Sequence, residues 1–141
     1  PDLSLLGGGF IEIETGEIFN KDGSTREWGK RGASGGLCAD NINSADNDQG
    51  YVILTLPEDV EEKDYTVKFR YATGEKSFAV KFTVNDGKTF STNETEAGNG
   101  WEFGATHDLL ATTEKVLLKG GDKLKIQTRG YGAIDYLSLD S

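Results

Sequence analysis

The stretch Tyr65-Thr66-Val67-Lys68-Phe69-Arg70-Tyr71 alternates large apolar or aromatic side chains with polar ones. A second stretch, Phe78-Ala79-Val80-Lys81-Phe82-Thr83-Val84, alternates large apolar side chains with small or polar ones after the turn signal Ala72-Thr73-Gly74-Glu75. Successive side chains of a strand point to opposite faces, so this period of two predicts two half-buried strands.

Further strands are predicted on both sides of these two. Tyr51 to Leu56 and Ala133 to Leu139 are strand-like, and the turn signals Asn85-Asp86-Gly87 and Lys119-Gly120-Gly121-Asp122 each precede another short apolar stretch. Asp108 to Leu118 suits a short helix as well as a strand. The usual spacing of turn signals in such folds predicts an all-β chain, an antiparallel β-sandwich of about eight short strands.

The composition favours one domain with many tight turns. The 141 residues suit a single domain over 1–141, and 19 of them are glycine, whereas proline occurs twice and methionine is absent. The single cysteine, Cys38, cannot form an internal disulfide. We expect it to be a small buried side chain rather than a reactive thiol.

The charge disfavours nucleic acid and anionic membranes as partners. The formal net charge is −9 at pH 7, so either surface would repel the chain unless a basic patch were segregated. The nearest basic group lies in a glycine-containing loop that also carries acids, and we interpret it as solvated: Lys21, Arg26, Lys30 and Arg31. No apolar run reaches the length of a membrane span, and no signal peptide is seen. The opening at Pro1 and the run Gly7-Gly8-Gly9 favour a module from a longer, secreted parent.

Acidic residues interrupt strand-forming stretches at both ends of the chain. Glu12 and Glu14 lie in Phe10-Ile11-Glu12-Ile13-Glu14, and Asp135 lies in Ala133-Ile134-Asp135-Tyr136-Leu137. Carboxylates are disfavoured in strands unless something compensates them. Side chains two apart on a strand share one face, with Cα atoms about 6.6 Å apart, so Glu12 and Glu14 suit one hard cation. If the first and last strands pair, Asp135 completes a calcium site.

A series of motifs resembles carbohydrate-binding modules of families 6, 35 and 36 over nearly the whole chain. In order, they are Glu12-Ile13-Glu14, Ala33-Ser34-Gly35-Gly36, Gly50-Tyr51-Val52, Tyr65 to Ala72, Thr83-Val84-Asn85, Gly100-Trp101, Val116 to Gly121 and Ile134-Asp135-Tyr136-Leu137. The resemblance implies a galactose-binding-like β-sandwich (jelly roll) that is non-catalytic and attached to a secreted bacterial glycoside hydrolase or cellulosomal protein. It also implies a structural calcium ion held by Glu12, Glu14 and Asp135, with backbone oxygens from the loop before Ala33.

The resemblance further implies a ligand cleft built by loops at one edge of the sandwich, with two aromatic rings and a polar residue. Trp101 matches the aromatic residue before the late strands, and Trp28 is the candidate for the second ring. Where many members carry asparagine before the Ile-Asp-Tyr segment, this chain has Ala133. We therefore expect the polar role to fall to Arg129, Tyr131 or Asn43.

The residue chemistry supports a sugar site. Pyranose rings present apolar faces and a belt of hydroxyls, so they need flat aromatic surface and a few hydrogen-bonding groups. Trp28 and Trp101 lie in glycine-flanked, polar stretches, although a tryptophan can also plug the end of a sandwich core. Tyr65 and Tyr71 alternate with core residues, and we assign them to packing.

Other polar motifs carry weaker signals. Asp40 to Asp48 is dense in oxygen ligands and could hold a second calcium ion, but acidic turns before a strand are common and the EF-hand pattern is not matched. The only histidine, His107, lies in a polar stretch and is expected to be solvated. No catalytic triad order, histidine metal pair or phosphate-binding loop is present in the sequence.

Three functional hypotheses follow from these observations. The leading one is a non-catalytic module, monomeric and extracellular, that holds a covalently linked enzyme against a plant cell-wall polysaccharide such as xylan, β-glucan, mannan or a galactose- or uronate-containing glycan. The rival is a small glycoside hydrolase or lyase using Glu12 and Glu14, although same-face neighbours are poorly disposed to flank a glycosidic bond. The third is a purely structural sandwich domain. The acidic surface disfavours a polyuronate unless calcium bridges the charges.

Overall fold

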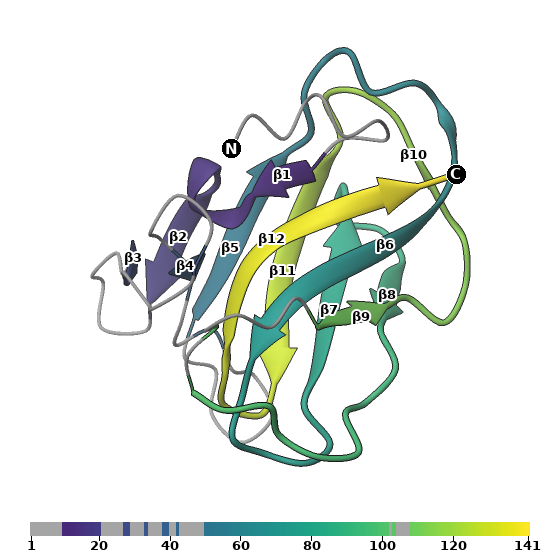
Figure 1. Cartoon of the computed structure of the whole chain (residues 1–141). Coiled ribbons are helices and arrows are strands. Elements are labelled where there is room, and N and C mark those ends of the chain that lie inside the picture. The colour runs from purple at the N-terminus through teal and green to yellow at the C-terminus, as the bar shows by residue number, and fades with distance from the viewer. Residues whose placement is uncertain are drawn as a thin grey trace.

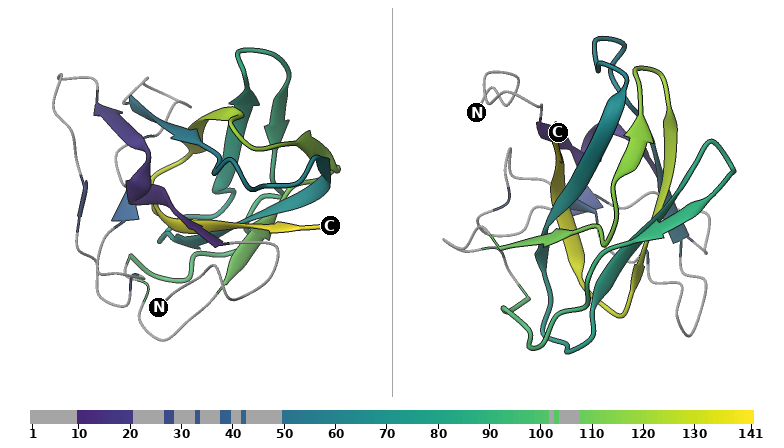
Figure 2. Two further views of the ribbon diagram at one scale, coloured as in Figure 1. Left: turned by 90° about the horizontal axis from the view of Figure 1, so that it is seen from above. Right: turned by 90° about the vertical axis from the view of Figure 1, so that its right-hand side faces the viewer.

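The chain folds into two antiparallel sheets packed face to face (Figures 1 and 2). The computed structural model describes residues 10–20, 27–28, 33, 38–39, 42, 50–101, 103 and 108–141. These residues form twelve strands and one 3-10 turn. The predicted antiparallel β-sandwich is therefore confirmed, with more strands than expected because several are only two or three residues long. Within the same residues, no helix has the length and hydropathy needed to cross a bilayer.

One sheet has seven strands built around the two longest. Its main order is β10 (Val116–Leu118), β6 (Lys63–Ala72), β12 (Ala133–Asp140), β4 (Cys38–Ala39) and β3 (Glu27–Trp28), while β9 (Leu109–Ala111) also pairs with β6 and β1 (Phe10–Glu12) with β12. The ambiguous stretch 108–118 thus forms two short strands. The first and last strands pair, with Phe10 opposite Ser138, so the condition for bringing Asp135 near the first strand is met.

The other sheet has five strands. In order, they are β2 (Glu17–Asn20), β5 (Gly50–Thr55), β11 (Lys123–Arg129), β7 (Ala79–Val84) and β8 (Thr89–Ser91). The β7–β8 hairpin turns at Asn85 and Asp86, which both have positive φ values, 49° and 60°. Asparagine and aspartate tolerate this left-handed region better than most residues, which explains the turn signal in the sequence.

The inward faces of the two sheets form one main core. Phe69 of β6 and Phe82 of β7 meet across the sandwich with ring centroids 5.8 Å apart. Tyr65 and Tyr71 are buried, which confirms their assignment to packing. Cys38 is also buried, as expected, and belongs to a second, smaller cluster with Ala72, Phe103 and Ala133.

The alternating pattern of β6 is broken at Arg70. The side chain was expected on the polar face of its strand, yet Arg70 is only 2% exposed and Asp135 is 0% exposed. The Arg70 guanidinium Nη1 donates to Asp135 Oδ2 at 2.7 Å, and Phe103 lies against the guanidinium with its ring centroid 5.1 Å away. The register between β6 and β12 shifts between Ile134 and Leu137, beside this pair. The carboxylate that interrupts the last strand is therefore compensated by Arg70.

The first strand is shorter than the sequence predicts. β1 ends at Glu12, and Ile13–Thr15 forms a 3-10 turn closed by the Gly16 amide, which donates to the Ile13 carbonyl at 3.1 Å. The turn arises because the buried Ile13 enters the core where the chain crosses to the other sheet. Glu12 and Glu14 are therefore not same-face neighbours on one strand, and that part of the prediction is wrong. The Glu14 side chain lies outside the described residues.

We predict that the Arg70–Asp135 pair is strongly coupled. Removing one partner of a buried ion pair leaves the other charge uncompensated, so Arg70→Met and Asp135→Asn should each cost about 3–5 kcal/mol of unfolding free energy. The double variant should cost clearly less than the sum. Chemical denaturation at constant calcium concentration gives the free energy of unfolding of the wild type, the two single variants and the double variant.

A matched control lies on the same two strands. Lys68 Nζ and Asp140 Oδ2 are also 2.7 Å apart, but their side chains are 35% and 52% exposed. The corresponding cycle with Lys68→Met and Asp140→Asn should show a coupling of about 1 kcal/mol or less. Equal coupling in the two cycles would contradict a special role for the buried pair.

Candidate functional site

Three loops meet at the end of the sandwich where β6 ends and β12 begins. Ala72 and Ala133 are opposite one another in the sheet register, so the β6–β7 loop and the β11–β12 turn leave the sheets side by side. The segment Asn99–Trp101 is bound to the first of these loops, because the amides of Asn99 and Gly100 both donate to the Thr73 carbonyl, at 2.8 and 2.9 Å. We call Gly74, Asn99, Trp101 and Tyr131 the loop cluster.

Trp101 presents the largest aromatic surface of this cluster. The residue is 53% exposed, so the alternative that it plugs the core is excluded. Its indole lies directly on Gly74: a Cβ atom added to that glycine would be 2.3 Å from Trp101 Cε2. Only glycine allows this close approach. The backbone of the β6–β7 loop thus forms a flat support for the ring.

Asn99 supports the same loop with its side chain. Its Oδ1 accepts from the Thr73 amide at 3.0 Å, and its Nδ2 donates to the Tyr71 carbonyl at 3.1 Å and to Asp108 Oδ2 at 3.2 Å. These bonds join segments that are distant in sequence, so the position of the neighbouring Trp101 does not depend on a single turn. Asp108 itself is exposed at the edge of the cluster.

Tyr131 is tied to the β6–β7 loop by two polar side chains. The Thr73 hydroxyl donates to the Tyr131 carbonyl at 2.6 Å, and the Tyr131 amide donates to the Glu75 carboxylate. The Tyr131 residue is 44% exposed, so its ring remains accessible at the same end of the molecule. Two exposed aromatic residues are therefore held on one hydrogen-bonded loop framework.

Ala133 lies beneath this framework rather than in it. The residue is 1% exposed and packs with Cys38, Ala72 and Phe103. A polar group at this position is therefore absent, as the sequence suggests, and the buried methyl instead supports the turn that carries Tyr131. Polar contacts at the cluster come from Asn99, Asp108 and Glu75, none of which was singled out from the sequence as a site residue. The dipeptide Asn99-Gly100, which precedes Trp101 and is typical of turns, is the sequence signal that could have indicated Asn99.

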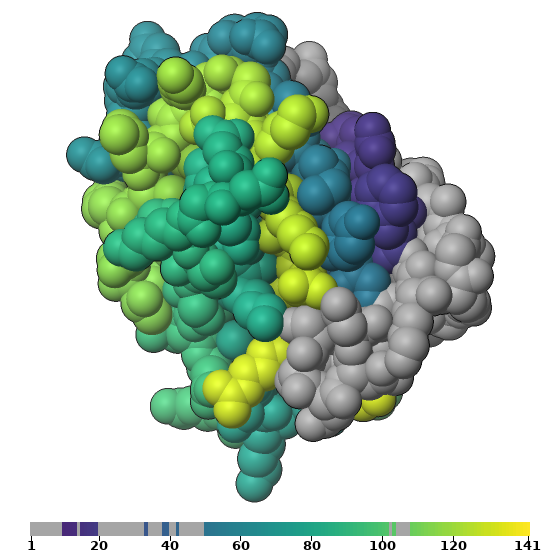
Figure 3. All heavy atoms as spheres, turned by 180° about the vertical axis from the view of Figure 1, so that it is seen from behind, coloured from purple at the N-terminus to yellow at the C-terminus, as the bar shows by residue number. Residues whose placement is uncertain are grey.

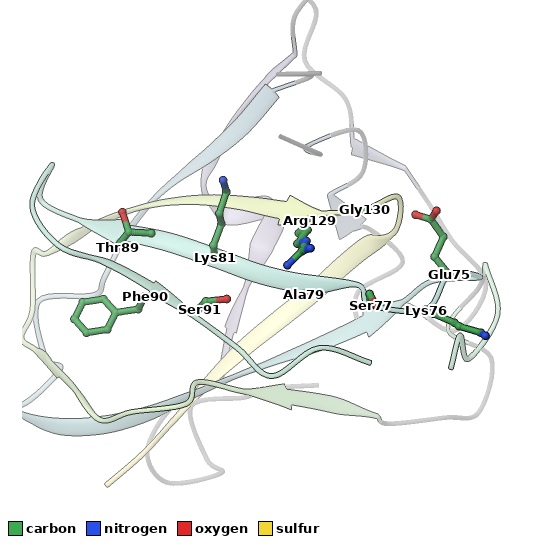
Figure 4. A pocket seen from close by; sticks show the side chains of 10 residues that line it. All are labelled: Glu75, Lys76, Ser77, Ala79, Lys81, Thr89, Phe90, Ser91, Arg129 and Gly130. Atoms are coloured by element: carbon green, nitrogen blue, oxygen red, sulfur yellow. The ribbon is translucent and has the colours of Figure 1, made fainter. Parts of the chain in front are cut away.

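Arg129, the last residue of β11, faces a neighbouring pocket. Its guanidinium Nη1 donates to Glu94 Oε1 at 2.6 Å, and both side chains are exposed. The pocket has a volume of about 660 Å³ and is lined by residues of the β6–β7 loop, β7, β8 and the end of β11 (Figure 4). The structure thus separates two of the predicted sugar contacts: Tyr131 belongs to the loop cluster and Arg129 to this pocket.

The predicted metal ligands are only partly brought together. Glu12 stands opposite Tyr136, the residue after Asp135. Burial raises the pKa of the Tyr136 hydroxyl, the charge of Arg70 opposes this rise, and the charges of Asp135 and Glu12 add to it. Carboxylate oxygens are the donors that Ca²⁺ prefers, so the pair fits the ion chemically. No group of three or more potential metal ligands was found among the described residues.

Several predicted site residues cannot be placed. The backbone of Trp28 lies in β3, but its side chain is outside the described residues, as are Asn43, His107 and the basic loop residues Lys21, Arg26, Lys30 and Arg31. Of the possible second calcium loop, Asp40 to Asp48, only Ile42 is described, and it is buried. The predictions for these residues stay predictions.

Comparison with known proteins identifies structures that share this fold. The sequence matches no known family profile and no curated protein. Solved structures do match: the family 35 carbohydrate-binding module from Clostridium thermocellum has a TM-score of 0.66 at 17% identity, over 94% of this chain and 98% of that one. The C-terminal family 6 module of a marine laminarinase from Zobellia galactanivorans has a TM-score of 0.59 at 16% identity, over 94% and 98%.

Longer enzymes contain the same fold as one part. The exo-β-1,3-galactanase from Phanerochaete chrysosporium has a TM-score of 0.66 at 18% identity and covers 94% of this chain, which spans only 29% of that enzyme. At these identities the likeness establishes the fold. The chain therefore has the β-sandwich fold of carbohydrate-binding modules of families 6 and 35, and the resemblance seen in its sequence is confirmed at that level.

We predict that Gly74→Ala displaces the Trp101 indole without unfolding the protein. The new methyl group occupies the space of the ring, while the loop keeps its other hydrogen bonds. In a Trp28→Phe background, tryptophan fluorescence should shift and the melting temperature should change by only a few degrees. Lys76→Ala, an exposed change in the same loop, should leave the emission unaltered; an unaltered Gly74→Ala spectrum would contradict the contact.

Proposed function

We propose that this chain is a non-catalytic carbohydrate-binding module that holds an attached enzyme on a plant cell-wall polysaccharide. The observation that carries the proposal is the exposed Trp101 ring on its glycine support, beside Tyr131, at one end of the sandwich. Isolated binding modules share this fold over nearly their whole length. An aromatic ring held on a rigid loop loses little entropy when a ligand docks, which favours a binding role.

The chemistry of the loop cluster suits a pyranose. The Trp101 face can stack on the apolar side of a sugar ring, while the carboxylates of Asp108 and Glu75 supply acceptors near it for the hydroxyls. Trp28 and Asn43 remain candidates for further contacts from the neighbouring loops, and Tyr131 for a second aromatic contact. The glycan itself is xylan, β-glucan, mannan or a galactose- or uronate-containing polymer.

The cellular setting follows from the same proposal. A module of this kind is a monomer linked to a larger bacterial parent, secreted and either enzymatic or cellulosomal. The linkage to a parent has this support: the solved enzymes that the chain resembles are much longer than the chain, as the 29% coverage of the galactanase illustrates. The linked parent gains a high local concentration on its substrate, which raises its effective affinity without any new contact.

The enzyme alternative has weaker support. It requires Glu12 and Glu14 to flank a glycosidic bond, but Glu12 ends β1 and the next residues turn away in a 3-10 helix. Glu12 does not line the pocket of about 660 Å³. A binding role accounts for the exposed aromatic rings, whereas a hydrolase role accounts for none of the features of the loop cluster.

We propose that Glu12, Glu14 and Asp135 hold a calcium ion that stabilises the fold. Glu12 and Asp135 would supply carboxylate oxygens from the paired first and last strands, and the ion would supply the positive charge that fixes these strands together. Arg70 already balances part of the charge of Asp135. A second ion in the loop Asp40 to Asp48 is part of the same proposal.

The first test concerns Trp101. Removing a central stacking contact commonly costs 2 kcal/mol or more, so Trp101→Ala should weaken binding of the recognised plant polysaccharide about thirtyfold while the melt stays near that of the wild type. Leu117→Ala is a matched control, because Leu117 is 61% exposed on β10, at the far end of β6. Calorimetric titration and affinity electrophoresis measure binding, and full binding by Trp101→Ala would remove the ring from the site.

Catalysis is tested on the same polysaccharides. The wild type should release no reducing sugar from any glycan that it binds. Reproducible hydrolysis that disappears in Glu12→Gln would instead support the enzyme alternative.

The calcium proposal predicts a loss of thermal stability on chelation. An ion present at about a hundred times its dissociation constant contributes roughly 2.7 kcal/mol to the native state, so its removal should lower the melting temperature by several degrees. The double change Glu12→Gln and Glu14→Gln should make the melt insensitive to added calcium, whereas Glu62→Gln with Glu96→Gln, two exposed acids, should not. An unchanged melt after metal analysis has confirmed removal would contradict the proposal.

A further inference from the structure

The segment that leads into Trp101 contains a dipeptide that can modify itself. Asn99-Gly100 is the only asparagine–glycine pair in the sequence. Asparagine is a chemically labile residue, and in such a pair the glycine nitrogen can attack the asparagine side chain because glycine has no Cβ atom to obstruct the approach. The residue that holds the loop cluster with three side-chain hydrogen bonds is therefore also a candidate for deamidation.

The reaction needs only water as a second reactant. The Gly100 nitrogen gives up its proton and bonds to Asn99 Cγ, the Cγ–Nδ2 bond breaks, and ammonia leaves with that proton. The product is a five-membered succinimide ring. Water then adds to one of its two carbonyl carbons and breaks the bond from that carbon to the ring nitrogen. Opening at Cγ gives aspartate, whereas opening at the backbone carbonyl gives isoaspartate, whose main chain is longer by one carbon atom.

The folded loop keeps the reacting groups engaged elsewhere. The Gly100 amide donates to the Thr73 carbonyl at 2.9 Å. The Asn99 carboxamide is held at both ends, because Oδ1 accepts from the Thr73 amide and Nδ2 donates to the Tyr71 carbonyl and to Asp108 Oδ2. The attack requires the carboxamide to turn onto the Gly100 nitrogen, which breaks these bonds. The reaction therefore proceeds from an opened loop.

The position of the loop allows such opening. Gly74, Gly98 and Gly100 are all exposed, and Gly100 has a φ value of 106°. Figure 3 shows the β6–β7 loop, in teal, projecting from the lower end of the molecule beside the yellow β11–β12 turn. Exposed loops with few buried apolar contacts open at a lower free-energy cost than core strands. Water also reaches the loop directly.

Conversion to aspartate reverses two contacts of Asn99. An oxygen atom replaces Nδ2, which now donates to the Tyr71 carbonyl at 3.1 Å and to Asp108 Oδ2 at 3.2 Å. A donor between two acceptor oxygens thus becomes a third acceptor, and it carries a charge of the same sign as Asp108. Two attractive contacts become repulsive.

Conversion to isoaspartate disturbs the backbone instead. The extra carbon atom separates two amides, those of residues 99 and 100, that share the Thr73 carbonyl as acceptor. The neighbouring backbones are already in contact, because a Cβ atom added to Gly98 would lie 2.6 Å from the Gly74 carbonyl carbon. The longer main chain therefore cannot keep both hydrogen bonds while Trp101 stays on Gly74.

We infer that Asn99 is a self-modification site, at which opening of the Trp101 loop is recorded as a permanent covalent change. Opening allows Gly100 to attack Asn99, and both products loosen the segment that carries the ring. The site thus sets a lifetime for the exposed aromatic surface. The chemistry and its effect on Trp101 rest on the contacts of the loop. Only one added expectation rests on the proposed function: a bound glycan should slow the reaction, because it stabilises the closed loop.

The first test measures the deamidation rate in mildly alkaline buffer. Trypsin cuts after Lys88 and Lys115 and gives one peptide that contains both Asn99 and the exposed Asn93, which is followed by glutamate and serves as an internal reference. Mass spectrometry follows the exchange of an amide for a hydroxyl, and an isoaspartyl methyltransferase labels isoaspartate. Asn99 should convert in the folded protein, at least about tenfold more slowly than in the isolated peptide, while Asn93 stays unmodified.

Variants of Asp108 test the control by the loop. Asp108→Ala removes one hydrogen bond of the carboxamide and should raise the rate at Asn99 about threefold. Asp108→Asn keeps an acceptor but removes the charge, and should react as slowly as the wild type. Glu96→Ala, an exposed acid of the same segment, is the matched control and should change nothing. Thermal melts check that each variant folds. An Asn99 that stays intact in wild type and Asp108→Ala while the peptide converts would overturn the inference.

The second test follows the Trp101 ring. Asn99→Asp reproduces one product, so in the Trp28→Phe background its tryptophan emission should shift while the melting temperature changes by only a few degrees. Asn93→Asp, the same change at the exposed reference position, should leave the emission unaltered. If the emission of Asn99→Asp and of the purified isoaspartate form is also unaltered, the modification does not release the ring and the inference is overturned.

A third arm separates this inference from the proposed function. Soluble xylan, β-glucan and mannan are added one at a time, and a polymer that binds at the loop cluster should slow the conversion of Asn99. If none of them binds while Asn99 still converts and the indole still moves, the proposed function loses its support and the self-modification site stands.

Discussion

The ion pair between Arg70 and Asp135 joins the two longest strands at a point that water does not reach. Two charges taken out of water are tolerated only with close geometry and further partners, and here the guanidinium also lies against the Phe103 ring. Phe103 in turn packs with Ala72 and Ala133, the residues at which the loops leave the sheet. The residues from which the loops of the cluster leave the sheet therefore pack, through Phe103, against this ion pair.

The strands were predictable because alternation reports burial directly. Val67 and Phe69 of β6, and Val80 and Phe82 of β7, face the core as their spacing requires. Arg70 was not predictable, because a charged residue in an alternating stretch is ordinarily solvated, and its partner lies far along the chain. The 3-10 turn at Ile13–Thr15 was missed for a similar reason: the alternation continues through it, while the crossing between sheets decides where the strand ends.

The candidate site was only partly accessible from the sequence. Trp101 could be proposed as an exposed aromatic residue from its glycine-flanked surroundings, whereas Tyr131 was proposed only for the polar role in the cleft. Gly74 and Asn99 could not, because their roles depend on contacts between separate loops.

The place of β12 in the seven-stranded sheet has a consequence for biosynthesis. This strand lies between β6 on one side and β1 and β4 on the other, although it is the last strand of the chain to be translated. A nascent chain can form the β7–β8 hairpin early and can pair β4 with β3, but β4 lacks its second neighbour, and β1 its one partner among the described strands, until β12 leaves the ribosome. Long-range pairings of this kind close slowly. The emerging domain therefore exposes unpaired strand edges until its synthesis is almost complete, and this interval is when a chaperone would have most to protect.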